Sequence, residues 1–261
     1  MIGFSDKNDK NSEKRESKDT EQIDSKQEIN SDTIWWSTES RASYSVLKNY
    51  IPGDETPDPD RSVTLTTQGT YAFLYHVQNL CIRWDGHISV GVYSPGEDFP
   101  LVVNLIYYLR KCGHNCVKSK TSWHLVYNTA FGPKSNETFP YSYVKDMNFD
   151  CSQSYDDIVS QFNTSFRSDH SLPYPINVVR NVARLNARTK YIFASDIELY
   201  PSVGIVSGFL QLLERQKSGL LPIIPQNNPH VYVIPIFEVK AGVDPPLNKS
   251  QLRALMKSGE S

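Results

Sequence analysis

Two acidic residues, Asp196 and Glu198, are the side chains in this sequence best suited to chemistry. They lie at the end of 191–195, a short apolar run that predicts a buried strand. Residues i and i+2 of an extended chain point to the same side, so both carboxylates would project together. Such oxygens suit Mn²⁺ or Mg²⁺, which bridges carboxylates to a diphosphate. The spacing suggests a divalent cation site, with a solvated strand end as the alternative.

A second candidate is the polar face of a helix predicted over residues 177–187. Asn177, Arg180, Asn181 and Arg184 are spaced i, i+3, i+4 and i+7, so they share one face. A guanidinium at Arg180 suits a phosphate or a carboxylate, and the amides suit sugar hydroxyls. An ordinary solvent-exposed face has the same composition, so the residues alone leave both interpretations open.

Composition and missing motifs exclude several function classes. The 261 residues carry a formal net charge of -2, which gives no global attraction to nucleic acid or to an anionic membrane. Nucleic acid is therefore not an expected partner, and an anionic ligand must bind at a local site. The sequence has no glycine-rich dinucleotide loop, Walker lysine loop, zinc-protease motif or nucleophile elbow. Dehydrogenases, P-loop NTPases and serine hydrolases are disfavoured.

Strands and helices are predicted to alternate along most of the chain. The strand candidates are 62–67, 87–93, 123–127, 191–195 and 231–236, and the helix candidates are 70–82, 100–111, 177–187 and a helix capped by Ser202. The apolar stripes of two of these helices are Phe73, Val77 and Leu80, and Val178, Val182 and Leu185.

This alternation predicts an α/β fold with a mostly parallel, Rossmann-like sheet covered by helices on both faces. Ligands of such sheets bind beyond the carboxyl ends of the strands. The loops at Gln68, Ser94 and Asp196 are therefore expected at the functional edge. Residues 128–172 are polar and weakly periodic, which predicts mostly loop with one short helix.

The N-terminal region differs in composition from the rest of the chain. Residues 1–33 are polar and charged and are predicted to be a disordered tail, 34–61 a linker or rim segment, and 62–261 a nucleotide-binding domain. The sequence shows no apolar core of a signal peptide and no run of about 18 apolar residues that would form a membrane anchor.

Cysteines and glycosylation sequons point to an oxidising compartment. Cys81, Cys112, Cys116 and Cys151 allow two disulfides with three connectivities, and four buried thiols are the alternative. A metal knuckle at 112–116 is disfavoured because no second ligand pair matches it. Sequons begin at Asn136, Asn163 and Asn248.

Several ordered blocks together resemble the LARGE-like and β-1,4-glucuronyltransferase family. The blocks are 66–69, 83–96, 174–184 and 196–202, and the resemblance runs from about Val63 to Ser261. Segments 234–240 and 246–252 are more similar to the glucuronyltransferase branch. The family has Asp at the position of Glu198, whose longer side chain is still expected to bind the metal.

The resemblance implies a GT-A fold, a UDP-glucuronic acid donor, Mn²⁺ and a glycan acceptor. It implies inverting β-1,4 transfer onto a xylose-bearing O-mannosyl-type glycan in the Golgi, by a type II membrane protein with a partner glycosyltransferase. It assigns the metal to Asp196 and Glu198, and the donor pocket to Asn177, Arg180, Asn181 and Asp196, with Thr66 and Thr67 near the uridine.

The family continues beyond the position of Ser261, and the catalytic base is expected in that continuation. This chain is therefore expected to be the donor-binding half of the enzyme, incomplete at its C-terminus. The alternative is a non-catalytic protein that binds a nucleotide sugar or a glycan.

Overall fold

The computed structural model describes residues 2–6, 37–41, 43–133, 149–162, 165–222 and 231–261. These residues form an eight-stranded sheet in the order β2-β3-β6-β5-β4-β7-β1-β8. The strands are β1 (Ile2–Asp6), β2 (Ser37–Arg41), β3 (Tyr44–Ile51), β4 (Val63–Gly69), β5 (Ile88–Tyr93), β6 (Thr121–Asn128), β7 (Tyr191–Ala194) and β8 (Val231–Ile234). Only β1 and β3 run against the other strands. The mostly parallel α/β sheet is confirmed.

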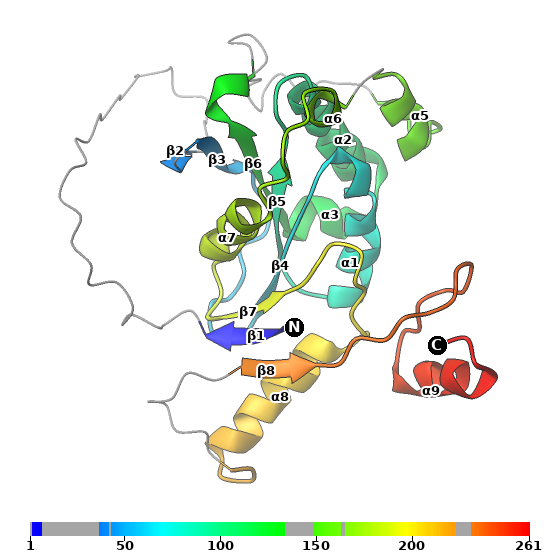
Figure 1. The fold of residues 1–261 in the computed structure, drawn as a ribbon. Helices are drawn as coiled ribbons and strands as arrows, with labels where there is room; N and C mark the ends of the chain where they lie inside the picture. The colour runs from blue at the N-terminus through cyan, green and yellow to red at the C-terminus, as the bar shows by residue number, and fades with distance from the viewer. Residues whose placement is uncertain (1, 7–36, 42, 134–148, 163–164, 223–230) are drawn as a thin grey trace, which may run out of the picture.

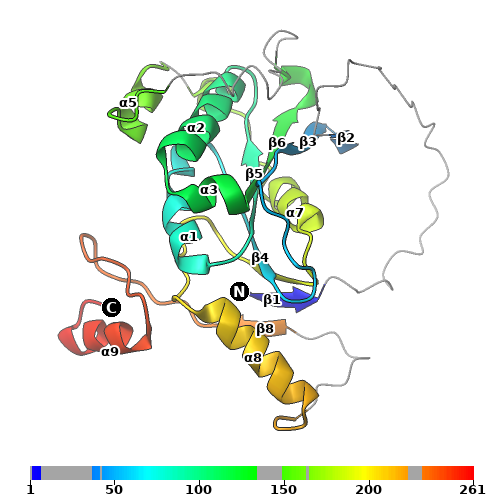
Figure 2. The same ribbon diagram turned by 180° about the vertical axis from the view of Figure 1, so that it is seen from behind.

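Helices cover both faces of this sheet. One face carries α1 (His76–Trp84), α2 (Asp98–Cys112), α3 (Asn115–Lys120) and α8 (Ile205–Lys217), and the other carries α7 (Ile176–Asn186) (Figures 1 and 2). The shorter helices η1 (Tyr71–Phe73), η2 (Thr129–Phe131), α5 (Tyr155–Ser160) and α6 (Phe166–Asp169) and the C-terminal α9 (Lys249–Ser258) complete the described elements. Among the described helices, none has the length and apolarity that crossing a bilayer requires.

The order of the parallel strands contains a reversal beside β4. From β4 the chain proceeds through α1 to β5 and then through α2 and α3 to β6, always on the same side of β4. It then returns through α7, on the opposite face, to place β7 on the other side of β4. The carboxyl ends of β4 and β7 therefore flank a topological switch point, where ligands of open α/β sheets bind.

Two apolar clusters hold the helices on the sheet. The larger one lies under α1 and α2, where the Trp84 ring stacks on Phe193 with centroids 5.1 Å apart. The smaller one fixes α7 through Val179 and Val182. Gly91 of β5 permits this approach, because a Cβ there would lie 2.5 Å from the Val179 carbonyl oxygen.

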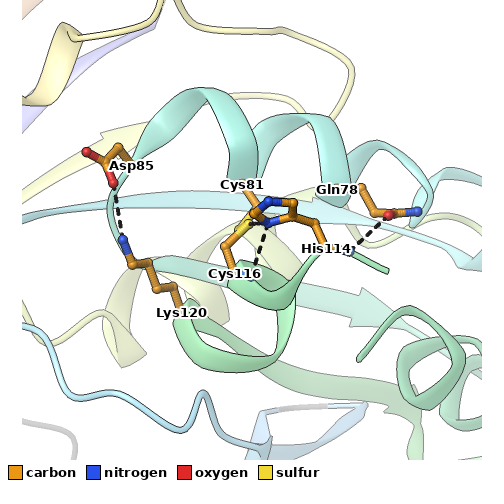
Figure 3. Close-up of a disulfide and its surroundings, with 6 residues drawn as sticks. All are labelled: Gln78, Cys81, Asp85, His114, Cys116 and Lys120. Atoms are coloured by element: carbon orange, nitrogen blue, oxygen red, sulfur yellow. Dashed lines mark hydrogen bonds and ion pairs between the residues drawn. A yellow bond between two sulfur atoms is a disulfide. The ribbon is translucent and has the colours of Figure 1, made fainter. Parts of the chain in front are cut away.

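Disulfides fasten the helical layer on the α1 face. Cys81 of α1 pairs with Cys116 of α3 (Figure 3). Cys112 at the end of α2 pairs with Cys151. The structure thus selects one of the three connectivities, and the alternatives of buried thiols and of a metal knuckle at 112–116 are wrong. Beside the first disulfide, Lys120 pairs with Asp85 at 3.2 Å.

Several sequence predictions for the helices need correction. Phe73 is 45% exposed, because the chain after Thr70 forms the η1 turn and the helix begins only at His76. Leu185 is 50% exposed, because α7 is turned so that Val179, Val182 and Ala183 face the sheet. Ser202 does not cap α8, which begins after Gly204 in the left-handed conformation at φ +83°.

The first 61 residues contribute more to the sheet than predicted. Residues 2–6, within the predicted tail, form β1 and pair with both β7 and β8. The predicted rim segment 34–61 contains β2 and β3, and β3 pairs with β6. The remaining residues predicted to be disordered lie outside the described part of the chain.

Candidate functional site

A cleft of about 330 Å³ lies at the switch point. The ends of β4 and β7 form its floor, and the segment leading into α7, α7 itself and α6 supply its other walls. It is lined by Gln68, Gly69, Thr70, Phe73, Arg167, Tyr174, Ile176, Arg180, Asp196, Ile197 and Glu198. Of the three loops expected at the functional edge, the segments at Gln68 and Asp196 meet in this cleft, whereas Ser94 does not line it, and Gln68 lies at the end of β4 rather than in a loop.

Asp196 is held at the centre of a polar network in this cleft. The Ser195 N–H donates to the Thr66 carbonyl at 3.1 Å, which continues the pairing of the two strands to the start of the acidic segment. Asp196 Oδ1 then accepts hydrogen bonds from Gln68 Nε2 at 3.0 Å and from the Arg180 guanidinium. The Tyr174 hydroxyl donates to Gln68 Oε1, so the amide is oriented with its NH₂ toward the carboxylate.

Burial raises the pKa of the Tyr174 phenol, whereas the positive charge of Arg180 acts in the opposite direction. Tyr174 therefore stays protonated at neutral pH and keeps its role as the donor to Gln68. The network has a fixed direction, from Tyr174 through Gln68 to Asp196.

Glu198 lines the same cleft as Asp196. Within the described part of the chain its carboxylate has no hydrogen bond and no ion pair. A turn closed by the Leu199 N–H donating to the Asp196 carbonyl at 3.1 Å connects the two acidic residues. Two residues further on, the Tyr200 hydroxyl lies 2.5 Å from His76 Nδ1 of α1, which anchors this turn to the helical layer.

Burial lowers the pKa of His76, and the negative charge of Glu198 partly opposes that effect. The imidazole is consequently neutral at pH 7 and adds no competing cation beside Glu198. The acidic residue is left available to a ligand of the cleft.

The donor set of the cleft fits a hard divalent cation. Both acidic residues line the same cleft, and oxygen is the ligand atom that such cations prefer. The described residues contain no group of three or more acidic, histidine or cysteine side chains arranged for a metal. Two carboxylates with the remaining positions left to water and phosphate oxygens are typical of nucleotide-bound Mg²⁺ or Mn²⁺.

The other residues predicted for donor binding lie around the cleft rather than in its lining. Asn177 and Asn181 are exposed on α7, on the same face as Arg180. Thr66 and Thr67 are only 4% and 1% exposed within β4, and the lining begins at the next residue, Gln68. Their donor-binding roles stay predictions.

Some cleft residues carried no recognised signal in the sequence. Phe73 appeared to be part of an apolar helix stripe. Arg167 lies on the short helix α6, in a segment without periodicity, so neither spacing nor composition singled it out. Tyr174 lay within a recognised block, but its hydrogen bond to Gln68 depends on the packing of distant segments.

Comparison with known proteins decides the family. The family model described as "Glycosyl-transferase for dystroglycan" matches residues 62–261, which include the whole cleft. The chain belongs to this glycosyltransferase family. The α/β fold and the switch-point cleft are consistent with the GT-A-like architecture expected from the sequence.

Two groups of relatives are similar to this member of the family. Beta-1,4-glucuronyltransferase 1 of Danio rerio is 27% identical over 231 residues, covering 83% of this chain and 50% of the relative. The Homo sapiens protein of the same name is 26% identical over 78% of this chain and 47% of its own length. Xylosyl- and glucuronyltransferase LARGE2s of Danio rerio is 21% identical over 83% of this chain.

The family member described here spans about half the length of the glucuronyltransferases that it matches. Family membership is shown by residues 62–261.

Proposed function

We propose that this chain forms the donor-binding half of a glucuronyltransferase. The donor would be UDP-glucuronic acid, and the acceptor a xylose-bearing O-mannosyl-type glycan that receives the sugar in β-1,4 linkage. The observation that carries the proposal is the meeting of Asp196 and Glu198 in one open cleft at the β4–β7 switch point. The names of the similar relatives support the choice of glucuronic acid over other sugars.

Asp196 and Glu198 would hold the divalent cation, proposed to be Mn²⁺. When bound, such a cation neutralises the charge that develops on a departing nucleoside diphosphate. The chain's own contribution is to position the two carboxylates. Gln68 fixes the Asp196 side chain by a hydrogen bond, and the His76–Tyr200 contact anchors the turn that carries Glu198.

Arg180 would change partners when the donor binds. Its guanidinium pairs with Asp196, and a diphosphate oxygen is an equally suitable acceptor for its planar fork. The cation would take the carboxylate while Arg180 turns to the phosphate. The Asp196 charge is thus balanced by Arg180 in the free cleft, and by the cation when the donor is bound.

Inverting transfer forms a bond from the acceptor oxygen to the anomeric carbon as the bond to the diphosphate oxygen breaks. UDP leaves with the electron pair, and the proton of the acceptor hydroxyl goes to a general base. We assign no described residue to that base. It belongs, with most of the acceptor site, to the part of the relatives that this sequence does not match.

The compartment is part of the same proposal. Two disulfides suit an oxidising lumen such as the Golgi, where a partner glycosyltransferase would supply the xylose-bearing acceptor. Of the three sequons, Asn136 and Asn163 lie outside the described residues. Asn248 is exposed, and its side-chain oxygen caps α9 by accepting from the Ser250 and Gln251 N–H groups.

The direct test is a transfer assay with UDP-glucuronic acid, Mn²⁺ and a xylose-terminated acceptor, followed by mass spectrometry of the glycan. A form extended to the length of the relatives is expected to add one hexuronic acid residue, and EDTA is expected to prevent it. Binding of the nucleotide sugar without transfer by that form would favour a non-catalytic binding protein. Transfer of a different sugar would refute the proposed donor.

A further inference from the structure

We infer that Arg167 determines donor specificity by binding the carboxylate of an acidic sugar nucleotide. This inference rests on the proposed function and assigns a role to a residue that the metal and diphosphate contacts leave unused.

The backbone of Arg167 is fixed by a buried carboxylate. Asp98, which is 2% exposed, accepts hydrogen bonds from the Phe166 N–H at 2.8 Å and the Arg167 N–H at 3.2 Å. The Phe166 ring lies against Gly96, where a Cβ would come within 2.6 Å of it. The same ring stacks on His170 with centroids 3.8 Å apart. These contacts hold α6 at the edge of the cleft.

Among the residues that the structure describes, the guanidinium of Arg167 forms no ion pair, although its positive charge acts on the Asp98 carboxylate, where it opposes the rise in pKa that burial causes. Its carbon Cζ lies 5.9 Å from the centroid of the Tyr174 ring, and the residue lines the cleft. Its Nε is shielded from solvent and has no hydrogen-bond acceptor among the residues that the structure describes. A buried donor without an acceptor is uncommon in a folded protein and requires an explanation.

The second arginine of the cleft differs in this respect. Arg180 donates to Asp196, so its charge is already engaged at the place where the cation and the diphosphate are proposed to bind. Arg167 is the cleft arginine with a charge still available for a further anionic group of the ligand. A planar guanidinium pairs well with a carboxylate through two parallel hydrogen bonds.

The position of Arg167 separates this group from the diphosphate. Arg167 is connected to Asp196 through a chain of contacts: its guanidinium lies near the Tyr174 ring, the Tyr174 hydroxyl donates to Gln68, and the Gln68 amide donates to Asp196. A positively charged side chain that bound the same phosphate as the metal would have to lie beside Asp196, as Arg180 does. Arg167 lines the same cleft without contacting Asp196, and the sugar attached to the diphosphate is proposed to extend toward it.

The test compares three ligands in the presence of Mn²⁺: UDP, UDP-glucose and UDP-glucuronic acid. Their affinities are measured by calorimetry for the wild type and for Arg167→Gln, Arg167→Lys and Arg184→Gln. Arg184 is the matched control, because it is an exposed arginine of α7 that does not line the cleft. Thermal unfolding of each variant establishes that it folds.

We expect Arg167→Gln to lower the affinity for UDP-glucuronic acid by about tenfold or more, because a charge-assisted hydrogen bond is lost. The affinities for UDP and UDP-glucose should stay unchanged. Arg167→Lys should lose part of the preference for UDP-glucuronic acid over UDP-glucose. Arg184→Gln should keep that preference in full. Equal losses for all three ligands, or an undiminished preference in a folded Arg167→Gln, would overturn the inference alone. A wild type that prefers UDP-glucose would overturn the proposed donor itself.

Discussion

The Arg180 guanidinium donates to the same Asp196 oxygen that accepts from Gln68. Arg180 is presented by α7 on one face of the sheet, and Asp196 follows β7, so their pairing joins α7 to the segment beyond one of the two strands that flank the switch point. A cation bound to Asp196 and the Arg180 side chain compete for one carboxylate. The site is consequently expected to bind cation and nucleotide cooperatively.

Replacement of Arg180 should change the affinity for Mn²⁺ and the affinity for UDP in opposite directions. Arg180→Gln removes a positive charge beside Asp196, so Mn²⁺ alone is expected to bind more tightly, whereas UDP loses a charge-assisted partner worth about tenfold. Electron paramagnetic resonance gives the Mn²⁺ affinity and calorimetry gives the UDP affinity. Arg184→Gln should alter neither. A parallel fall of both affinities in Arg180→Gln would contradict the competition.

The close approach of α7 to β5 provides a test of packing. Gly91→Ala places a methyl group 2.5 Å from the Val179 carbonyl oxygen and 2.8 Å from its Cγ1, so α7 must move. We expect a loss of about 1–3 kcal/mol in the free energy of unfolding, measured by denaturant titration, together with weaker UDP binding because Val179 precedes Arg180. Gly208→Ala in α8, where nothing lies within 4 Å, should stabilise by about 0.5–1 kcal/mol.

His124 should make the stability of the fold depend on pH. Burial, followed by the charges of Arg188 and Lys48, lowers the pKa of His124 from 6.5 to about 3. Its Nδ1 accepts from the Asn49 N–H at 2.8 Å, and its Nε2 lies 2.9 Å from Ser89 Oγ, an arrangement that suits a neutral ring.

Below pH 6.5 the unfolded state therefore binds a proton at His124 that the folded state does not. Stability is expected to fall as pH decreases from about 6.5 toward 3, by up to about 1.4 kcal/mol per pH unit from this residue. Denaturant titrations between these limits should give a shallower slope for His124→Gln than for the wild type. Equal slopes would show that the ring is protonated in the folded protein.

Local patterns predicted the elements that carry the site but not the contacts between them. The spacing of Asn177, Arg180 and Asn181 was sufficient to place them on one exposed face of α7, because a helix repeats every 3.6 residues. The predicted apolar stripe of the same helix began at Val178, whereas the residue that packs most deeply, against Gly91, is Val179.

Contacts between distant segments were beyond sequence reasoning. The insertion of β1 beside β7 pairs two segments that are far apart in the sequence, and the polar composition of the segment that follows β1 concealed it. The position of Arg167 depends on Asp98, 69 residues earlier in the chain, and on a four-residue helix. The choice among disulfide connectivities likewise required the three-dimensional arrangement of α1, α2 and α3.

The most direct test of the account is calorimetric titration of UDP, with Mn²⁺ and with EDTA, into the wild type and into Asp196→Asn and Glu198→Gln. Both substitutions keep the size of the side chain and remove its charge, and thermal unfolding establishes that each variant folds. The account predicts Mn²⁺-dependent UDP binding to the wild type that falls by about tenfold or more in each variant. UDP binding that persists unchanged in EDTA and in both variants would contradict it.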